Sequence, residues 1–204
     1  MSSLRWKAES YIRRMARKEI SKGWKKIKTI KVSKTLKKSV VKGFDEFKEM
    51  FDEKGTDPRE VILLYCIAAL EYANGNDDAK YMATLVLPKN YCHKDPASPS
   101  GLTIDIKGEL YFLNHIREHP NNVKSYLGGT PDNNYELDED NLELKIIKEG
   151  IEKKKALIVI QSAGKDMSTP VELKKNRDGY WKIFKGTSSI ATGVKVTAEE
   201  VDDF

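Results

Sequence analysis

The chain has 204 residues, of which 39% are hydrophobic and 33% are charged, a composition typical of a folded domain with a densely charged surface. No apolar run approaches the roughly 18 residues needed to span a bilayer, and the first residues lack the apolar block of a secretory signal. The two cysteines, Cys66 and Cys92, are too few for a disulfide framework, so we expect a reduced, cytoplasmic protein.

Charge is distributed unevenly along the chain. Residues 1–42 contain fifteen Lys or Arg and two Glu, which gives this segment a charge of +13; because the whole chain carries +5, the remainder carries −8. Such an asymmetry predicts a basic arm attached to an acidic body. We therefore divide the chain into a basic amphipathic arm, residues 1–42, and a domain formed by residues 43–204.

The beginning of the arm has the pattern of an amphipathic helix. At the helical spacing of about 100° per residue, one side collects an apolar wedge made of Leu4, Ala8, Tyr11, Ile12 and Met15. The opposite side carries Arg13, Arg14 and Arg17. Residues 24–32 fit helix and strand patterns about equally, so their structure is left open.

The next part of the chain is predicted to be helical. Asp57, Pro58 and Glu60 form a helix start, because Asp caps the first turn, Pro suits the first helical position and Glu completes a capping box. This helix ends at Asn74, and its wide apolar face predicts a central position. Other helices are predicted over residues 34–53, 78–87 and 107–118, with a loop over residues 89–101.

Strand patterns follow in the second half. Residues 142–146 alternate between apolar and charged, and residues 157–160 form a continuous apolar run that suits a strand covered on both faces. Two more alternating runs flank a turn at Asp178 and Gly179, since Gly tolerates the positive φ of a tight hairpin. Helices first and strands later predict an α+β fold, with N-terminal helices packed on a C-terminal antiparallel sheet of about four strands.

Several segments together resemble a family of bacterial domains of unknown function. The motifs are a Gly-x-Thr-Pro-x-Asn-x-Tyr turn (residues 128–135), a Ser-x-Gly-x-Asp loop followed by a Pro-x-x-Leu hairpin (residues 162–173), Trp181, and the pair Ser188-Ser189. The resemblance covers about residues 44–204 and implies an α+β fold without a known catalytic residue. The residue pattern of positions 170–183 is also similar to that of the last strands of NTF2-like domains. This second resemblance implies a similar fold and nothing about function.

A candidate metal site lies at the end of the helix predicted over residues 107–118. His115, Glu118 and His119 match the His-x-x-Glu-His pattern of inverted zinc peptidases, in which two histidines four apart share a metal and the glutamate is the general base. Pro120 ends the helix directly after this pattern and no third ligand is evident. We therefore expect the two histidine side chains to spread into solvent and to bind no metal.

Two other sites are weaker. Cys92 and His93 could form a nucleophile and its base, but adjacent residues rarely point at each other.

Tyr126 and Tyr135 flank the Gly128-Gly129 turn and are expected to be exposed. With Thr130 and Asn133 they would form a small binding surface.

The function that we expect follows from the charge and the amphipathic pattern of the arm. The sequence predicts a non-enzymatic bacterial interaction module without cofactor or metal, cytoplasmic or peripheral to a membrane, whose arm binds an acidic membrane or protein surface. The arm residues expected to bind are Arg13, Arg14, Arg17, Lys18, Lys22, Lys25 and Lys26. The alternatives are a small metal-dependent hydrolase that uses His115, Glu118 and His119, and non-specific nucleic-acid binding by the arm.

Overall fold

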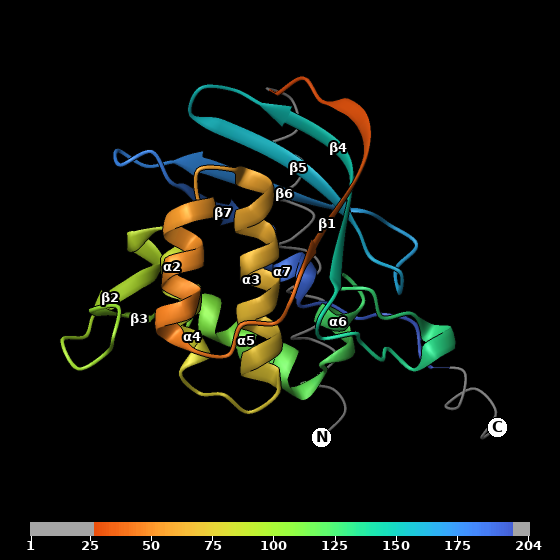
Figure 1. The fold of residues 1–204 in the computed structure, drawn as a ribbon, viewed down its shortest axis with the longest axis horizontal. Helices are drawn as coiled ribbons and strands as arrows, with labels where there is room; N and C mark the ends of the chain where they lie inside the picture. Colours follow the sequence, from red (N-terminus) through yellow and green to blue (C-terminus); the bar gives the residue numbers. More distant parts are fainter. Residues whose placement is uncertain (1–26, 198–204) are drawn as a thin grey trace.

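The computed structural model describes residues 27–197, which form a layer of helices on one face of an antiparallel sheet (Figure 1). The helices are α2 (Phe44–Lys54), α3 (Pro58–Ala73), α4 (Ala79–Val86), α5 (Glu109–Glu118), α6 (Asn121–Lys124) and α7 (Thr187–Ile190), with 3-10 turns η1 (Lys89–Tyr91) and η2 (Pro131–Asn133). The strands are β1 (Ile30–Lys38), β2 (Cys92–Lys94), β3 (Leu102–Ile104), β4 (Leu142–Ile151), β5 (Lys155–Gln161), β6 (Thr169–Lys175) and β7 (Trp181–Lys185).

The main sheet confirms the predicted α+β class. Its strand order is β1-β4-β5-β6-β7, and all neighbouring strands are antiparallel. The last three strands form the predicted meander, and Gly179 in the turn before β7 has the expected positive φ of 91°. The sheet has five strands rather than about four, and β2 and β3 form a small separate hairpin around part of the predicted 89–101 loop.

The additional strand corrects one prediction. The sequence predicts a helix over residues 34–53, but residues 30–38 form β1 and the helix starts only at Phe44. Val32 and Leu36 are four residues apart, a spacing that places two side chains on one side of either a helix or a strand. This segment forms a strand because it pairs with β4, which places Leu36 opposite Leu144 over the core. The segment assigned to the arm therefore contributes one edge of the sheet.

The core lies between α3 and the sheet. Almost every residue of α3 from Val61 to Tyr72 is buried, which confirms its predicted central position. The Asp57 carboxylate accepts a hydrogen bond from Arg59 N at 2.8 Å, as the predicted cap requires. Cys66 is also buried there, as expected of a small core residue. Although α3 is apolar, no helix within residues 27–197 has the length and apolarity needed to cross a membrane.

A charged network joins β1, β4 and the start of α3. Arg59 donates from Nε and Nη2 to the two oxygens of Glu149 at 2.6 and 3.0 Å, and Lys34 Nζ donates to the same carboxylate at 2.9 Å. Arg59 also binds Asp57, the cap of α3. These contacts hold the pKa of Glu149 down at about 2, mainly through the hydrogen bonds from Arg59. The network thus fixes the edge strand to the central helix.

Candidate metal centre

The last turn of α5 positions the His-x-x-Glu-His pattern. This helix forms because Leu113 and Ile116 are spaced to face the core, where both are fully buried. The residues between them then face outward. The helix ends at Glu118, and the backbone N–H of His119 still closes the last turn by bonding to the carbonyl of His115 at 3.0 Å.

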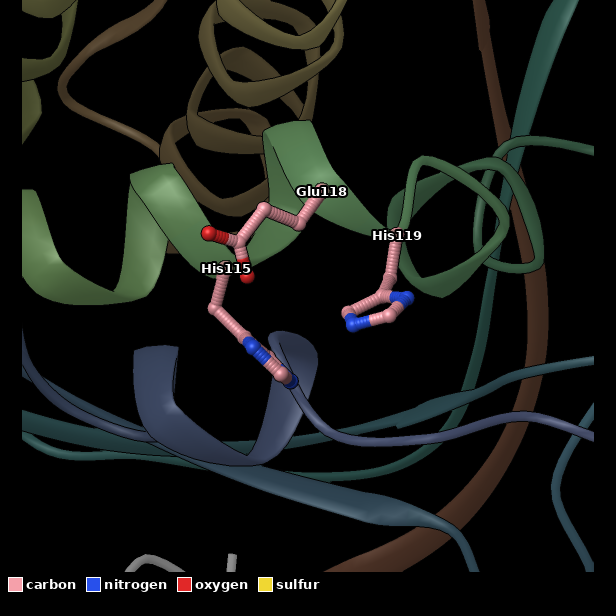
Figure 2. A group of neighbouring side chains, drawn as sticks. All are labelled: His115, Glu118 and His119. Atoms are coloured by element: carbon pink, nitrogen blue, oxygen red, sulfur yellow. The ribbon is translucent and has the colours of Figure 1, made fainter. Parts of the chain in front are cut away.

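The three predicted side chains converge. One ligand atom of each of His115, Glu118 and His119 lies within 4.8 Å of the other two. The two imidazole rings are 4.8 Å apart between centroids at an interplanar angle of 65°. Figure 2 shows the His115 ring and the Glu118 carboxylate on the same side of α5, with the His119 ring beside them. Within residues 27–197, no other group of three His, Cys, Asp or Glu side chains gathers in this way.

This geometry corrects the expectation that the histidines spread into solvent. Both residues are half-buried, whereas Glu118 is exposed. Residues four apart on a helix lie one above the other, so the spacing of His115 and His119 places the two rings side by side. The non-helical backbone of His119, with φ −136° and ψ 70°, does not separate them.

The opposite side of α5 is anchored to the end of α3. Arg117 Nε donates to the carbonyl of Tyr72 at 2.9 Å, and its guanidinium lies 3.6 Å from the centre of the Tyr72 ring. The Tyr72 hydroxyl donates to Asn114 at 2.7 Å, and Arg117 also pairs with Asp77 at 2.7 Å. These contacts hold the turn that carries the three candidate ligands in a fixed position.

The donor set suits a divalent transition metal. Two imidazole nitrogens and a carboxylate oxygen are ordinary zinc ligands at about 2.0–2.2 Å, which places the ligand atoms of a tetrahedral site about 3.3 Å apart. The observed separation of at most 4.8 Å exceeds this spacing by only about 1.5 Å. Three protein ligands would leave the fourth position open for water or another ligand.

The Cys92 and His93 pair does not have the geometry of a catalytic dyad. The two residues are neighbours on β2, so their side chains point to opposite faces of the hairpin. His93 Nε2 lies 3.7 Å from Asp105, and burial raises the pKa of the Cys92 thiol to about 11. A thiol of this pKa is protonated at neutral pH, whereas a nucleophilic cysteine must be a thiolate.

The predicted surface turn is corrected in its aromatic part. Tyr126 is 1% exposed and Tyr135 is 0% exposed, so neither contributes to a surface. The Tyr126 hydroxyl shares a 2.5 Å hydrogen bond with Thr169, and the Tyr135 hydroxyl donates to the carbonyl of Lys195 at 2.8 Å. Each ring is buried because its polar end finds a partner inside the protein. The sequence around the Gly-Gly turn does not show that these tyrosines have partners so far along the chain.

Thr130 and Asn133 form the cap of η2. The Thr130 side chain accepts from Asn133 N at 3.3 Å, and the Asn133 side chain accepts from Thr130 N at 2.8 Å. This reciprocal capping box stabilises the turn. Their part in a binding surface stays a prediction.

Three of the motifs that carry the family resemblance meet in one place: the turn that ends at Tyr135, the Ser-x-Gly-x-Asp loop and the Ser-Ser pair. Tyr135 of the first motif packs against Gly164 of the second. Lys165, next in the chain, donates from Nζ to the carbonyl of Ser189 at 2.7 Å, which joins the second motif to the Ser-Ser pair at the end of α7. Burial lowers the pKa of Lys165 to about 7. A lone Gly-Lys pair in the sequence gives no signal that the lysine is buried.

Close packing at this junction makes Gly164→Ala destabilising. A Cβ at Gly164 would collide with the Tyr135 hydroxyl and would lie 2.9 Å from Val194 Cβ. We expect a loss of about 1–2 kcal/mol in the free energy of unfolding, measured by urea denaturation. Gly193→Ala is the control, because a Cβ there meets nothing within 4 Å. Equal stability of the two variants would show that the junction yields to the added methyl group.

The comparisons with known proteins agree with the resemblance. A family model described as a domain of unknown function (DUF6935) matches residues 39–198. No curated protein matches the chain, and no solved structure matches it. The matched range contains every helix of the described fold and the strands from β2 onward, while β1 lies before it.

Proposed function

Because the chain belongs to the family of the DUF6935 domain, whose description gives no activity, we propose from the side chains themselves that it binds a divalent transition metal, zinc in the first place, through His115, Glu118 and His119. The supporting observation is that ligand atoms from all three side chains lie within 4.8 Å of one another. The pattern was already visible in the sequence, where two histidines stand four residues apart.

The ligand types favour a transition metal such as zinc over magnesium or calcium. Imidazole suits zinc, copper and nickel, and a purely oxygen site would instead suit magnesium or calcium. The open fourth position would let the metal hold a water molecule or a ligand of a partner. If Glu118 binds the metal directly, it is not free to act as a general base, so metal binding and hydrolysis are distinct proposals.

Zinc titration of the full-length chain tests the proposal. After removal of bound metal with a chelator, calorimetry should show one zinc site per chain, and His119→Gln should weaken it at least about tenfold because a ligand is lost. The control is His93→Gln, an exposed histidine on β2 that should leave the affinity unchanged. A site that persists in His115→Gln and His119→Gln, or that is lost in the control, would contradict the assignment.

The charge of residues 1–42 supports a second proposal, that the arm binds an acidic partner. Fifteen Lys or Arg in this segment favour an anionic membrane or protein surface. The expected binding residues, from Arg13 to Lys26, lie outside the described range, so their role stays a prediction. Sedimentation of the full-length chain with anionic vesicles, compared with a chain lacking residues 1–26, would test it; equal binding of the two chains would refute it.

A further inference from the structure

The face of the sheet that points away from the helices is also apolar at its centre. Along β5, Ala156, Ile158 and Ile160 belong to the core beneath the helices, so the alternating Leu157 and Val159 point to the other face. These two side chains are 2% and 0% exposed, although they do not belong to that core. We call the face that carries Leu157 and Val159 the outer face.

The chain approaches β1 across this outer face. Gly150 on β4 is the direct partner of Leu157, so the two residues share a face of the sheet. A Cβ at Gly150 would collide with the carbonyl oxygen of Lys28 and would lie 2.7 Å from Ile27 Cγ2. The backbone just before β1 therefore lies against the outer face beside Leu157.

We propose that residues 1–26 continue over the outer face and cover Leu157 and Val159 with the apolar wedge of Leu4, Ala8, Tyr11, Ile12 and Met15. This segment is directly connected to the outer face, since it ends just before Ile27, which already lies there. A helix over residues 4–15 would be about 18 Å long, which matches the width of about 19 Å across five strands. Burial of the wedge and of the two sheet residues would stabilise both.

The arrangement of charges fits the same occupant. Four charged residues pair with outer-face positions and would border the covered strip: Lys145 and Lys148 on β4, and Glu172 and Lys174 on β6. Arg13, Arg14 and Arg17 stand opposite the wedge in a helix and would point away from these lysines into solvent. The basic side of the arm would then be presented on a folded support, with its apolar side used inside the protein.

A double-mutant cycle on the full-length chain tests the contact. The wedge variant is Ile12→Gln with Met15→Gln, the face variant is Leu157→Ala with Val159→Ala, and the third protein carries all four changes. Each pair of changes alone should lower the melting temperature by about 4 °C or more, and the combined protein should melt well above the temperature expected from adding the two losses. Arg13→Gln with Arg14→Gln is the control and should leave the melting temperature unchanged.

Two results would overturn the proposal. A wedge variant that melts with the wild type, or strictly additive losses, would mean that the wedge does not contact this face. Sedimentation would identify other occupants: a dimer that dissociates in the face variant would assign the face to a second copy. Vesicle binding that survives 0.5 M salt and is lost in the wedge variant would assign the wedge to a membrane. Zinc affinity should be the same in all these proteins, so failure here leaves the metal proposal untouched.

Discussion

A chain that starts at residue 43 should lose cooperative unfolding, or melt at least about 8 °C below the full-length protein, because it lacks β1. This strand pairs along the whole first part of β4 and places Leu36 opposite Leu144 at the edge of the core. Removing it would also remove the buried Val41 and leave the edge of β4 unpaired. An unpaired, partly apolar edge favours aggregation, so we expect poor solubility as well.

The matched protein is one that starts at residue 27 and keeps β1. It should unfold cooperatively, with only the smaller loss that follows from uncovering the outer face. Thermal melting followed by circular dichroism compares the two proteins. Equal melting of both would show that the sheet closes without β1, and would support the boundary that the charge distribution predicts at residue 42. A loss confined to the shorter chain would move the boundary to before β1.

Replacing Glu149 with Gln should lower the free energy of unfolding by about 2–3 kcal/mol. Its carboxylate accepts two hydrogen bonds from Arg59 and one from Lys34, and it is largely buried. A neutral amide would leave the Arg59 charge without its main partner, which is the costly way to break a buried ion pair. Glu143→Gln is the matched control, since this residue lies on the same strand in a more exposed pair with Lys37. Its loss should be much smaller.

The same network sets a pH dependence with a defined sign. The pKa of Glu149 is lowered from its ordinary value to about 2 in the folded protein, so the folded state binds fewer protons than the unfolded chain. Its contribution is therefore complete above the ordinary pKa of about 4.5 and is lost as the pH falls toward 2. Urea denaturation at pH 7, 4 and 3 should show the difference between wild type and Glu149→Gln shrinking steadily. A constant difference would exclude this linkage.

Local signals in the sequence predicted most of the helical layer and the meander. Asp57 and Pro58 mark the start of α3, and Gly179 marks the last hairpin, because capping and positive φ depend only on neighbouring residues. The strand β1 was not predicted, because the spacing of Val32 and Leu36 fits a helix as well as a strand. Its partner strand, β4, lies far along the chain. An apolar spacing of four is ambiguous until that partner is known.

The candidate site was found but its geometry was not. The spacing of His115 and His119 follows from the sequence, whereas the half-burial of both rings depends on how the end of α5 packs on the rest of the protein. The sequence also failed to predict that the two tyrosines beside the Gly-Gly turn are buried. The sequence predicts that Tyr126 and Tyr135 lie on a surface, whereas in the structure both are buried and their hydroxyl groups bond to Thr169 and to the Lys195 carbonyl.

The place of β1 in the sheet has a consequence for the order in which the protein folds. More than 100 residues separate paired positions such as Lys38 and Leu142. During synthesis the first strand must therefore wait, with its edge unpaired, until most of the chain has left the ribosome, and closing so long a loop is slow. The meander of β5 to β7 has only local pairings and should form earlier. Pulse-labelled hydrogen exchange during refolding should accordingly protect the amides of β6 before those of β1.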